Sequence, residues 1–145
     1  MIQRIQSVFL FLAAACCFGP FALPFAQSPE GAVLSSGIFA DGVYNLADQI
    51  SLPIIFALAG LFALVTIFLF KRRKLQMRMA MLTAIIVFFA MAFVVVFLLQ
   101  DPTAEVTFDI KAGVIFPPLA FLFALLGHRY IKKDEKLVRS MDRLR

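Results

Sequence analysis

The sequence predicts an all-α membrane protein in which four helices cross the bilayer and both termini lie on the cytoplasmic side. Of its 145 residues, 62% are hydrophobic and 16% are charged, whereas soluble domains average roughly 45–50% and about 25%. A chain this short has too much surface for its volume to bury such an apolar excess. Four long apolar runs and a one-sided distribution of basic residues complete the prediction.

The four predicted transmembrane helices cover residues 7–26, 50–70, 79–99 and 112–131. About 20 helical residues span the roughly 30 Å hydrocarbon layer, and helices are required because lipid offers no partner to unpaired backbone groups. The second and third runs contain no ionisable residue. Residues 27–49 and 100–111 form the two outer loops. Residues 71–78 form an inner loop, and residues 132–145 form an inner tail. We treat residues 1–145 as one membrane domain.

The first run also fits a cleaved secretory signal, because Arg4 precedes an apolar stretch that ends near Ala26, and residues 13–16 resemble a lipoprotein cleavage box. Two observations favour a retained helix instead. The run extends over 20 residues, which is longer than the apolar core of a signal, and Pro24 stands where a cleavage site requires a small residue.

The basic residues fix the predicted orientation. Thirteen of the 14 Lys and Arg residues fall on one side: Arg4, five within residues 71–78 and seven from Arg129 onward. The outer loops instead carry six acids and one base, Lys111. Those acids are Glu30, Asp41, Asp48, Asp101, Glu105 and Asp109. Because positive loops are retained in the cytoplasm, residues 71–78 and both termini are predicted to lie inside.

Prolines and a short alternating segment characterise the outer side. Pro20 and Pro24 should bend or fray the outer half of the first helix, whereas Pro53 and Pro117 suit a first helical turn, where the missing N–H is no loss. Residues 105–111 alternate, with Val106, Phe108 and Ile110 on one face, as in a strand with one buried face. Residues 32–39 have the pattern of a hairpin. We therefore expect a small extracytoplasmic β cap.

No residue set in the sequence predicts catalysis, a metal or a cofactor. The sequence has no glycine-rich phosphate loop, no metalloprotease motif and no Cys/His cluster. Cys16 and Cys17 are adjacent within an apolar run and do not predict a disulfide. His128 falls at the inner end of the fourth helix, where we expect it to contact head groups or a helix C-terminus. No nucleic-acid partner is expected.

Small residues recur four apart on three of the predicted helices. This spacing lets helices approach closely, either within the bundle or against another subunit. The candidate helix-packing residues are Ala59, Ala63, Ala80, Ala84, Ala120 and Ala124.

The basic tail is the candidate contact surface. Its charge should attract anionic head groups on the inner side, at about 1 kcal/mol per basic residue. Leu137, Met141 and Leu144 recur at i, i+4 and i+7, so a tail helix would carry an apolar stripe. Such a helix either lies in the membrane interface or docks on a partner. The candidate contacts are Lys132, Lys133, Lys136, Leu137, Arg139, Met141 and Leu144.

The two ends of the chain resemble one known family. They read MIQRIQ at residues 1–6, IKKDEKLVRS at 131–140 and DRLR at 142–145. In these segments, and in length and layout, the chain resembles a Bacteroidota family of four-helix membrane proteins catalogued as a domain of unknown function (number 4293). The resemblance implies the inner membrane of a Gram-negative cell and no particular activity.

The function that the sequence favours is a non-catalytic one. A small membrane protein without polar residues at mid-bilayer depth, but with an amphipathic tail, is typical of a subunit or accessory factor of a larger membrane protein complex. The alternative is a lipid- or small-solute-handling protein that acts as an oligomer. A membrane enzyme is the least favoured class, because nucleophile, base and metal set are all lacking.

Overall fold

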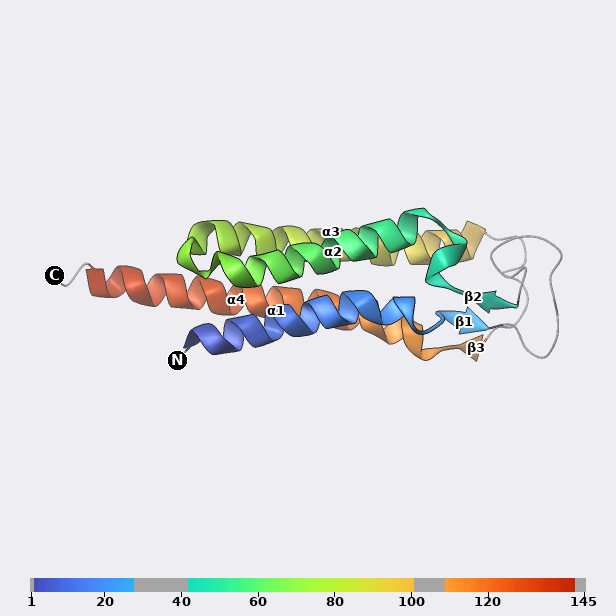
Figure 1. The fold of residues 1–145 in the computed structure, drawn as a ribbon, viewed down its shortest axis with the longest axis horizontal. Helices are drawn as coiled ribbons and strands as arrows, with labels where there is room; N and C mark the ends of the chain where they lie inside the picture. Colours follow the sequence, from blue (N-terminus) through green and yellow to red (C-terminus); the bar gives the residue numbers. More distant parts are fainter. Residues whose placement is uncertain (1, 28–41, 101–108, 143–145) are drawn as a thin grey trace.

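The computed structural model describes residues 2–27, 42–100 and 109–142, and these form an elongated helical bundle with a small sheet at one end (Figure 1). The α-helices are α1 (Ile2–Phe18), α2 (Ser51–Phe68), α3 (Arg73–Gln100) and α4 (Phe116–Asp142). Short 3-10 helices adjoin them: η1 (Gly19–Phe21), η2 (Leu46–Asp48), η3 (Leu69–Lys71) and η4 (Ala112–Ile115). The strands are β1 (Ala26–Gln27), β2 (Val43–Tyr44) and β3 (Asp109–Ile110).

The four helices pack in a ring. Each one contacts its neighbours in sequence, and α4 closes the ring against α1. The beginning of α1, the α2–α3 connection and the end of α4 lie at one end of the bundle, while the three strands lie at the other (Figure 1). We call these the basic end and the sheet end.

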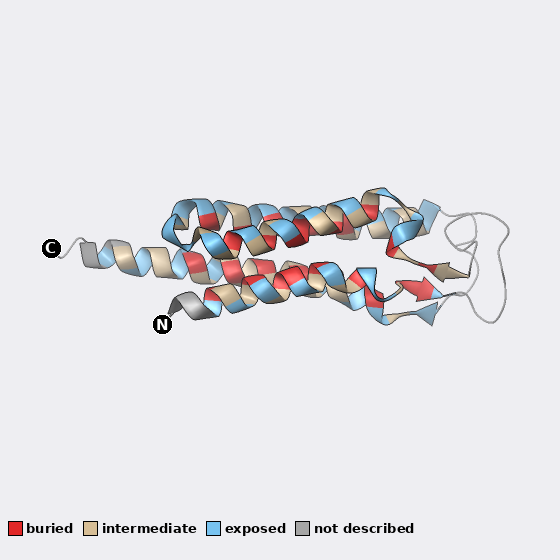
Figure 2. Ribbon diagram, viewed as in Figure 1, coloured by how far each residue is buried: buried red, intermediate tan, exposed pale blue. Residues whose placement is uncertain are grey.

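Buried residues line the interior of the bundle and exposed ones cover its outside (Figure 2). On α3 the buried positions recur at helical spacing, at Gln76, Ala80, Thr83, Ala84, Val87 and Ala90. The outward positions of α2 and α3 carry bulky exposed side chains, among them Ile54, Leu58, Leu61, Phe88, Phe89 and Phe93. A soluble bundle has polar residues on its outer face, so this arrangement suits an apolar solvent.

Within the described residues, three helical segments are long and apolar enough to cross a membrane. They are Ser51–Lys71, Arg73–Gln100 and Ala112–Val138, and Ile5–Phe21 is a shorter apolar helix. The structure therefore supports the mostly helical fold and indicates a multi-pass membrane protein.

The first helix ends earlier than predicted. We predicted a helix over residues 7–26, but α1 spans Ile2–Phe18 and only η1 continues it. Pro20 lies in the first turn of η1. Proline lacks an N–H and its ring clashes with the preceding helical turn, so an α-helix cannot continue undisturbed through this position.

The predicted inner loop over residues 71–78 is wrong in extent. Of this segment only Lys71, in η3, and Arg72 precede α3, which begins at Arg73. Lys, Arg, Gln and Met are good helix formers, and long basic side chains reach water while their stems cover apolar surface. The helix therefore continues beyond its apolar run.

The tail is helical as expected as far as Asp142, but it is not a separate helix. It continues α4 without a break from Phe116. The final residues, 143–145, lie outside the described part of the chain.

A three-stranded antiparallel sheet forms the sheet end, with the order β2-β1-β3. Ala26 pairs with Tyr44 on one side and with Ile110 on the other. The small β structure that we predicted is thus present, although Ala26 of β1 was assigned to the first helix and Gln27 to the outer loop. The predicted buried face is wrong at Ile110, whose side chain is 72% exposed, because β3 is an edge strand with both residues exposed. Val106, Phe108 and the hairpin at 32–39 lie outside the described residues.

Candidate functional site

A layer of alanines closes the middle of the bundle. Ala13 and Ala14 of α1, Ala63 of α2, Ala84 of α3 and Ala124 of α4 form one buried cluster. All six predicted helix-packing alanines are at most 1% exposed. The structure thus places them between helices of the same chain. Side chains this small let all four backbones approach closely.

At the basic end, a buried amide links α3 to the end of α2. Gln76 Nε2 donates a hydrogen bond to the backbone oxygen of Thr66, at 3.1 Å, and both residues are buried. The same carbonyl accepts the N–H of Leu69, which caps α2. A carbonyl oxygen has two lone pairs, so the Gln76 side chain gives this carbonyl a second donor and links α3 to the end of α2.

His128 lies against α3, so its backbone partner is not the helix C-terminus that was one of the two predicted contacts. Its Nδ1 is 3.0 Å from the backbone oxygen of Met77, and its ring is partly buried. A carbonyl oxygen only accepts, so Nδ1 must carry a proton to donate. The contact was not foreseen because residues 71–78 were taken as a loop, whereas α3 already runs beside α4 there.

An ion pair also joins these two helices. Arg73 Nη1 lies 3.6 Å from Asp134 Oδ2, and the two side chains are 26% and 13% exposed. At this distance the pair is electrostatic, and Nη1 is buried without a hydrogen-bond partner among the described residues. Partly exposed pairs of this kind contribute roughly 0–1 kcal/mol.

On the far side of α4, Gln6 Nε2 donates to the backbone oxygen of Tyr130 at 3.3 Å. Side-chain hydrogen bonds or ion pairs thus join α1 to α4, α2 to α3 and α3 to α4 at the basic end. Sequence reasoning missed Gln6, Gln76 and Asp134. For Gln76 a signal existed, because it precedes Ala80 by four residues and so continues the buried stripe of α3.

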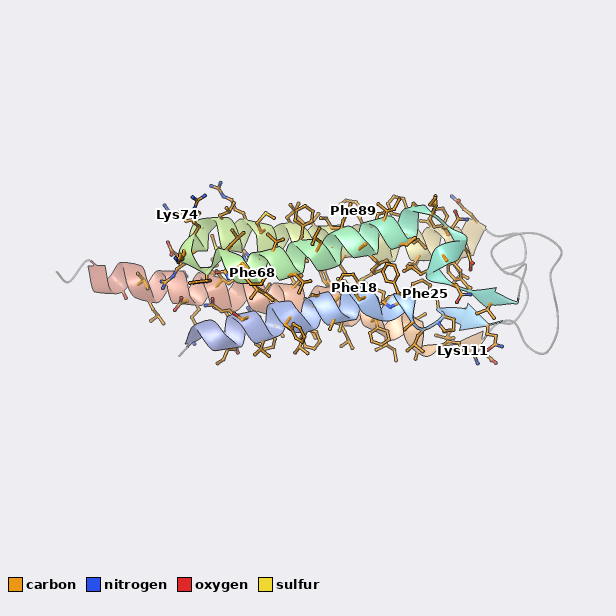
Figure 3. All side chains as sticks on the ribbon, viewed as in Figure 1. Phe18, Phe25, Phe68, Lys74, Phe89 and Lys111 are labelled. Carbon is orange, nitrogen blue, oxygen red and sulfur yellow. The ribbon has the colours of Figure 1, made fainter. Side chains whose placement is uncertain are left out.

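Hollows formed by the described residues lie among the basic side chains of this end. One, of about 480 Å³, is lined by Lys71, Arg72, Arg73, Lys74, Leu75, Arg78 and Glu135. A second, of about 460 Å³, is lined by Leu126, Arg129, Tyr130 and Lys133. A third, of about 300 Å³, is lined by His128, Arg129, Lys132, Lys133 and Lys136. Lys74 lies at the basic end and Lys111 near the sheet end (Figure 3).

The structure describes the side chains of four of the seven predicted tail contacts. Lys132, Lys133 and Lys136 are exposed, and Leu137 is 42% exposed. The three lysines line a hollow and Leu137 does not. The side chains of Arg139 and Met141, and the whole of Leu144, lie outside the described part.

The sheet end is held by an aromatic cluster. Phe25 and Tyr44 are both buried, with ring centroids 5.4 Å apart, and the Tyr44 hydroxyl lies 3.5 Å from the backbone oxygen of Val94 as a donor. Burial raises the pKa of Tyr44 to about 12, and the negative charge of Asp48 adds to this.

The titration of Tyr44 is therefore expected at unusually high pH. In a Tyr130→Phe variant Tyr44 is the remaining tyrosine, and its phenolate absorbance should appear with a midpoint near pH 12 rather than about 10. Because the pKa of Tyr44 is higher in the folded than in the unfolded state, the contribution of neutral Tyr44 to the free energy of unfolding is complete below about pH 10. It is lost as the pH rises toward 12. A midpoint near 10 in the folded protein would contradict the buried position of the ring.

An apolar groove of about 220 Å³ lies beside this cluster. Its walls come from α3, from the start of α4 and from the sheet end, at Phe25, Met91, Val94, Val95, Val114, Pro117 and Pro118.

Cys16 and Cys17 are free thiols on α1. Among the described residues, His, Cys, Asp and Glu side chains form no group that could hold a metal ion.

Comparison with known proteins gives a family but no relative of known activity. No curated protein and no solved structure matches the chain. Residues 2–144 match the model of a family described as Domain of unknown function (DUF4293), and the chain belongs to this family.

Proposed function

We propose that this chain is a four-span protein of the cell inner membrane that acts without catalysis, as a subunit or accessory factor of a larger membrane protein complex. In this arrangement the basic end faces the cytoplasm and carries both termini, and the sheet end faces outward. Segments rich in Lys and Arg at one end of the bundle support this orientation.

The fourth span in this proposal is α1 continued by η1. Together they run from Ile2 to Phe21, and a helical segment of about 20 residues measures roughly 30 Å. Packing supports the assignment, since α1 lies against both α2 and α4 over its length. Its outward face carries exposed Ile5, Val8 and Phe11.

The observation that carries the complex-subunit proposal is the length of α4. It continues to Asp142 and projects beyond the other three helices at the basic end (Figure 1). Lys136 and Leu137, near the end of α4, are exposed. A helix that leaves its own bundle can offer a surface to a partner, whereas a topology signal needs only charge.

The alanine layer supports a non-transporting role for a single copy. Transport sites are marked by ionisable residues, broken helices or cavities at mid-membrane depth. In the part of the chain that the structure describes, the middle of the bundle is instead packed with Ala13, Ala14, Ala63, Ala84 and Ala124.

The test is co-purification of the full chain in mild detergent. The unaltered protein should retain other membrane subunits in fixed stoichiometry, and the variant with Leu137, Met141 and Leu144 all changed to Ser should release them while inserting normally. A parallel variant with Lys132, Lys133 and Lys136 changed to Gln measures the electrostatic share, which salt should weaken. If the Ser variant keeps its partners, the tail only orients the chain and the partners bind elsewhere; if the unaltered protein retains no other subunit, the proposal is refuted.

The second candidate function, a lipid- or small-solute-handling oligomer, is favoured by the apolar groove at the sheet end. Pro117 and Pro118 line this groove together with Val94 and Val114. In this case the purified chain should form homo-oligomers, and no other subunit should accompany it.

A further inference from the structure

The basic residues of α4 are concentrated on one side of the helix. At 3.6 residues per turn, Arg129, Lys132, Lys133 and Lys136 fall within an arc of roughly 100°. This arc points away from buried Ile131 and Gly127. The neighbouring acids of α4, Asp134 and Glu135, lie outside it.

Both acids are placed beside the beginning of α3 instead. Asp134 pairs with Arg73, and Glu135 shares the hollow of Lys71, Lys74 and the neighbouring arginines. The charges of the segment are therefore separated, with acids toward α3 and bases on the opposite side. Such a separation is more than a topology signal needs, because the positive-inside rule counts bases and is little affected by acids.

The basic arc is unfavourable to the helix on its own. Arg129 and Lys132 are three residues apart, as are Lys133 and Lys136, while Arg129–Lys133 and Lys132–Lys136 are four apart. Like charges at these spacings repel one another and destabilise the helix. A bound anion would remove this repulsion.

The shape of the arc fits an anion that carries an apolar chain. Two adjacent hollows share Arg129 and Lys133 in their walls. The larger one is also lined by Tyr130, whose ring stacks on Phe9 of α1 at 5.1 Å, so one wall is held by two helices. Leu126 lines the same hollow. Toward the membrane the same face of α4 continues with Leu122, which is 48% exposed.

From this arrangement we infer that α4 holds an anionic phospholipid at a defined site. Its phosphate lies between Arg129 and Lys133, and an acyl chain follows Leu126 and Leu122. Lys132 and Lys136 border the head group on the cytoplasmic side. The inference rests on the proposed orientation of α4 in the membrane but requires no protein partner.

Native mass spectrometry of the purified full chain tests the site. In mild detergent with phosphatidylglycerol, the protein should retain one lipid per chain, and phosphatidylethanolamine should bind at least about tenfold more weakly. The Arg129→Gln/Lys133→Gln variant should lose affinity for phosphatidylglycerol by about tenfold or more, since each base near a head group contributes about 1 kcal/mol. Circular dichroism checks that its helix content is unchanged.

The matched control is Lys71→Gln/Lys74→Gln, which removes the same charge from the hollow at the α2–α3 connection. It should leave phosphatidylglycerol binding within about twofold of the unaltered protein. Equal loss in both variants would mean attraction by net charge alone, and the site would be refuted. Displacement of the lipid by millimolar inorganic phosphate would show a site for soluble anions and would overturn the assignment to lipid.

Discussion

Replacing Ala84 with Leu is expected to destabilise the bundle strongly. Ala84 lies in the layer where all four helices meet, beside Ala63 and Ala124, and is 1% exposed. The three added carbons have no space unless the helices separate, and overpacking of this kind costs typically 1–3 kcal/mol and occasionally more. Unfolding in mixed micelles of mild and denaturing detergent, followed by helix content, measures the loss.

The matched control uses the next residue of the same helix. Ile85 is exposed on the outer face of α3, so Ile85→Leu keeps volume and apolar character and should change stability by less than about 0.5 kcal/mol. If Ala84→Leu is as stable as this control, the helices do not meet closely at the alanine layer, and the closed interior described above is incorrect.

Replacing Gly113 with Ala is expected to disrupt the sheet end. A Cβ at this position would overlap the backbone oxygen of Pro24 and would lie 2.6 Å from that of Leu23. These are main-chain atoms, and the N–H of Gly113 is itself hydrogen-bonded to the Pro24 oxygen at 3.0 Å. Neither can move without breaking the contact between η4 and the segment before β1, so we expect a loss of about 1–3 kcal/mol.

Gly127→Ala is the control for this change. Its Cβ would lie 3.1 Å from Leu10 Cδ2 and at an ordinary contact distance of 3.9 Å from the Leu10 backbone nitrogen, and a leucine side chain can adjust by a few tenths of an ångström. The same unfolding measurement, combined with the phenolate titration of Tyr44, separates the two sites. Gly113→Ala should lower the Tyr44 midpoint toward its ordinary value, whereas Gly127→Ala should not. A Tyr44 midpoint that stays as high as in the unaltered protein, together with full stability of Gly113→Ala, would contradict the close approach of Gly113 to the backbone of Leu23 and Pro24.

The apolar runs were sufficient to predict the helices but not where they end. Length and hydropathy predict that residues 50–70 and 79–99 are helical, since an apolar span of this length pairs all its backbone groups internally when it is a helix. The start of α3 at Arg73 depends instead on helix propensity within a charged segment, which hydropathy does not register. Likewise β1 was hidden in the first apolar run, because Phe25 and Ala26 are as apolar as the helix before them.

The sequence alone predicted some of the candidate sites but not others. Alanines four apart predicted close helix packing, and the structure places them inside the bundle. The hollow beside Arg129 was not predictable, because one wall depends on Tyr130 stacking on Phe9 of a helix more than a hundred residues earlier. The ion pair between Arg73 and Asp134 was likewise not predictable, because it depends on how far α3 and α4 are shifted along one another.

The measurement that most directly tests the membrane arrangement uses reporter fusions at both ends of the bundle. A reporter fused after Arg145, or inserted between Lys71 and Arg73, should report the cytoplasm, and one inserted between Gly31 and Asp41 should report the outer side. Four spans with the basic end inside require this pattern, because α1 and α4 must each cross once. A cytoplasmic signal from residues 31–41, or an outer signal after Arg145, would contradict it.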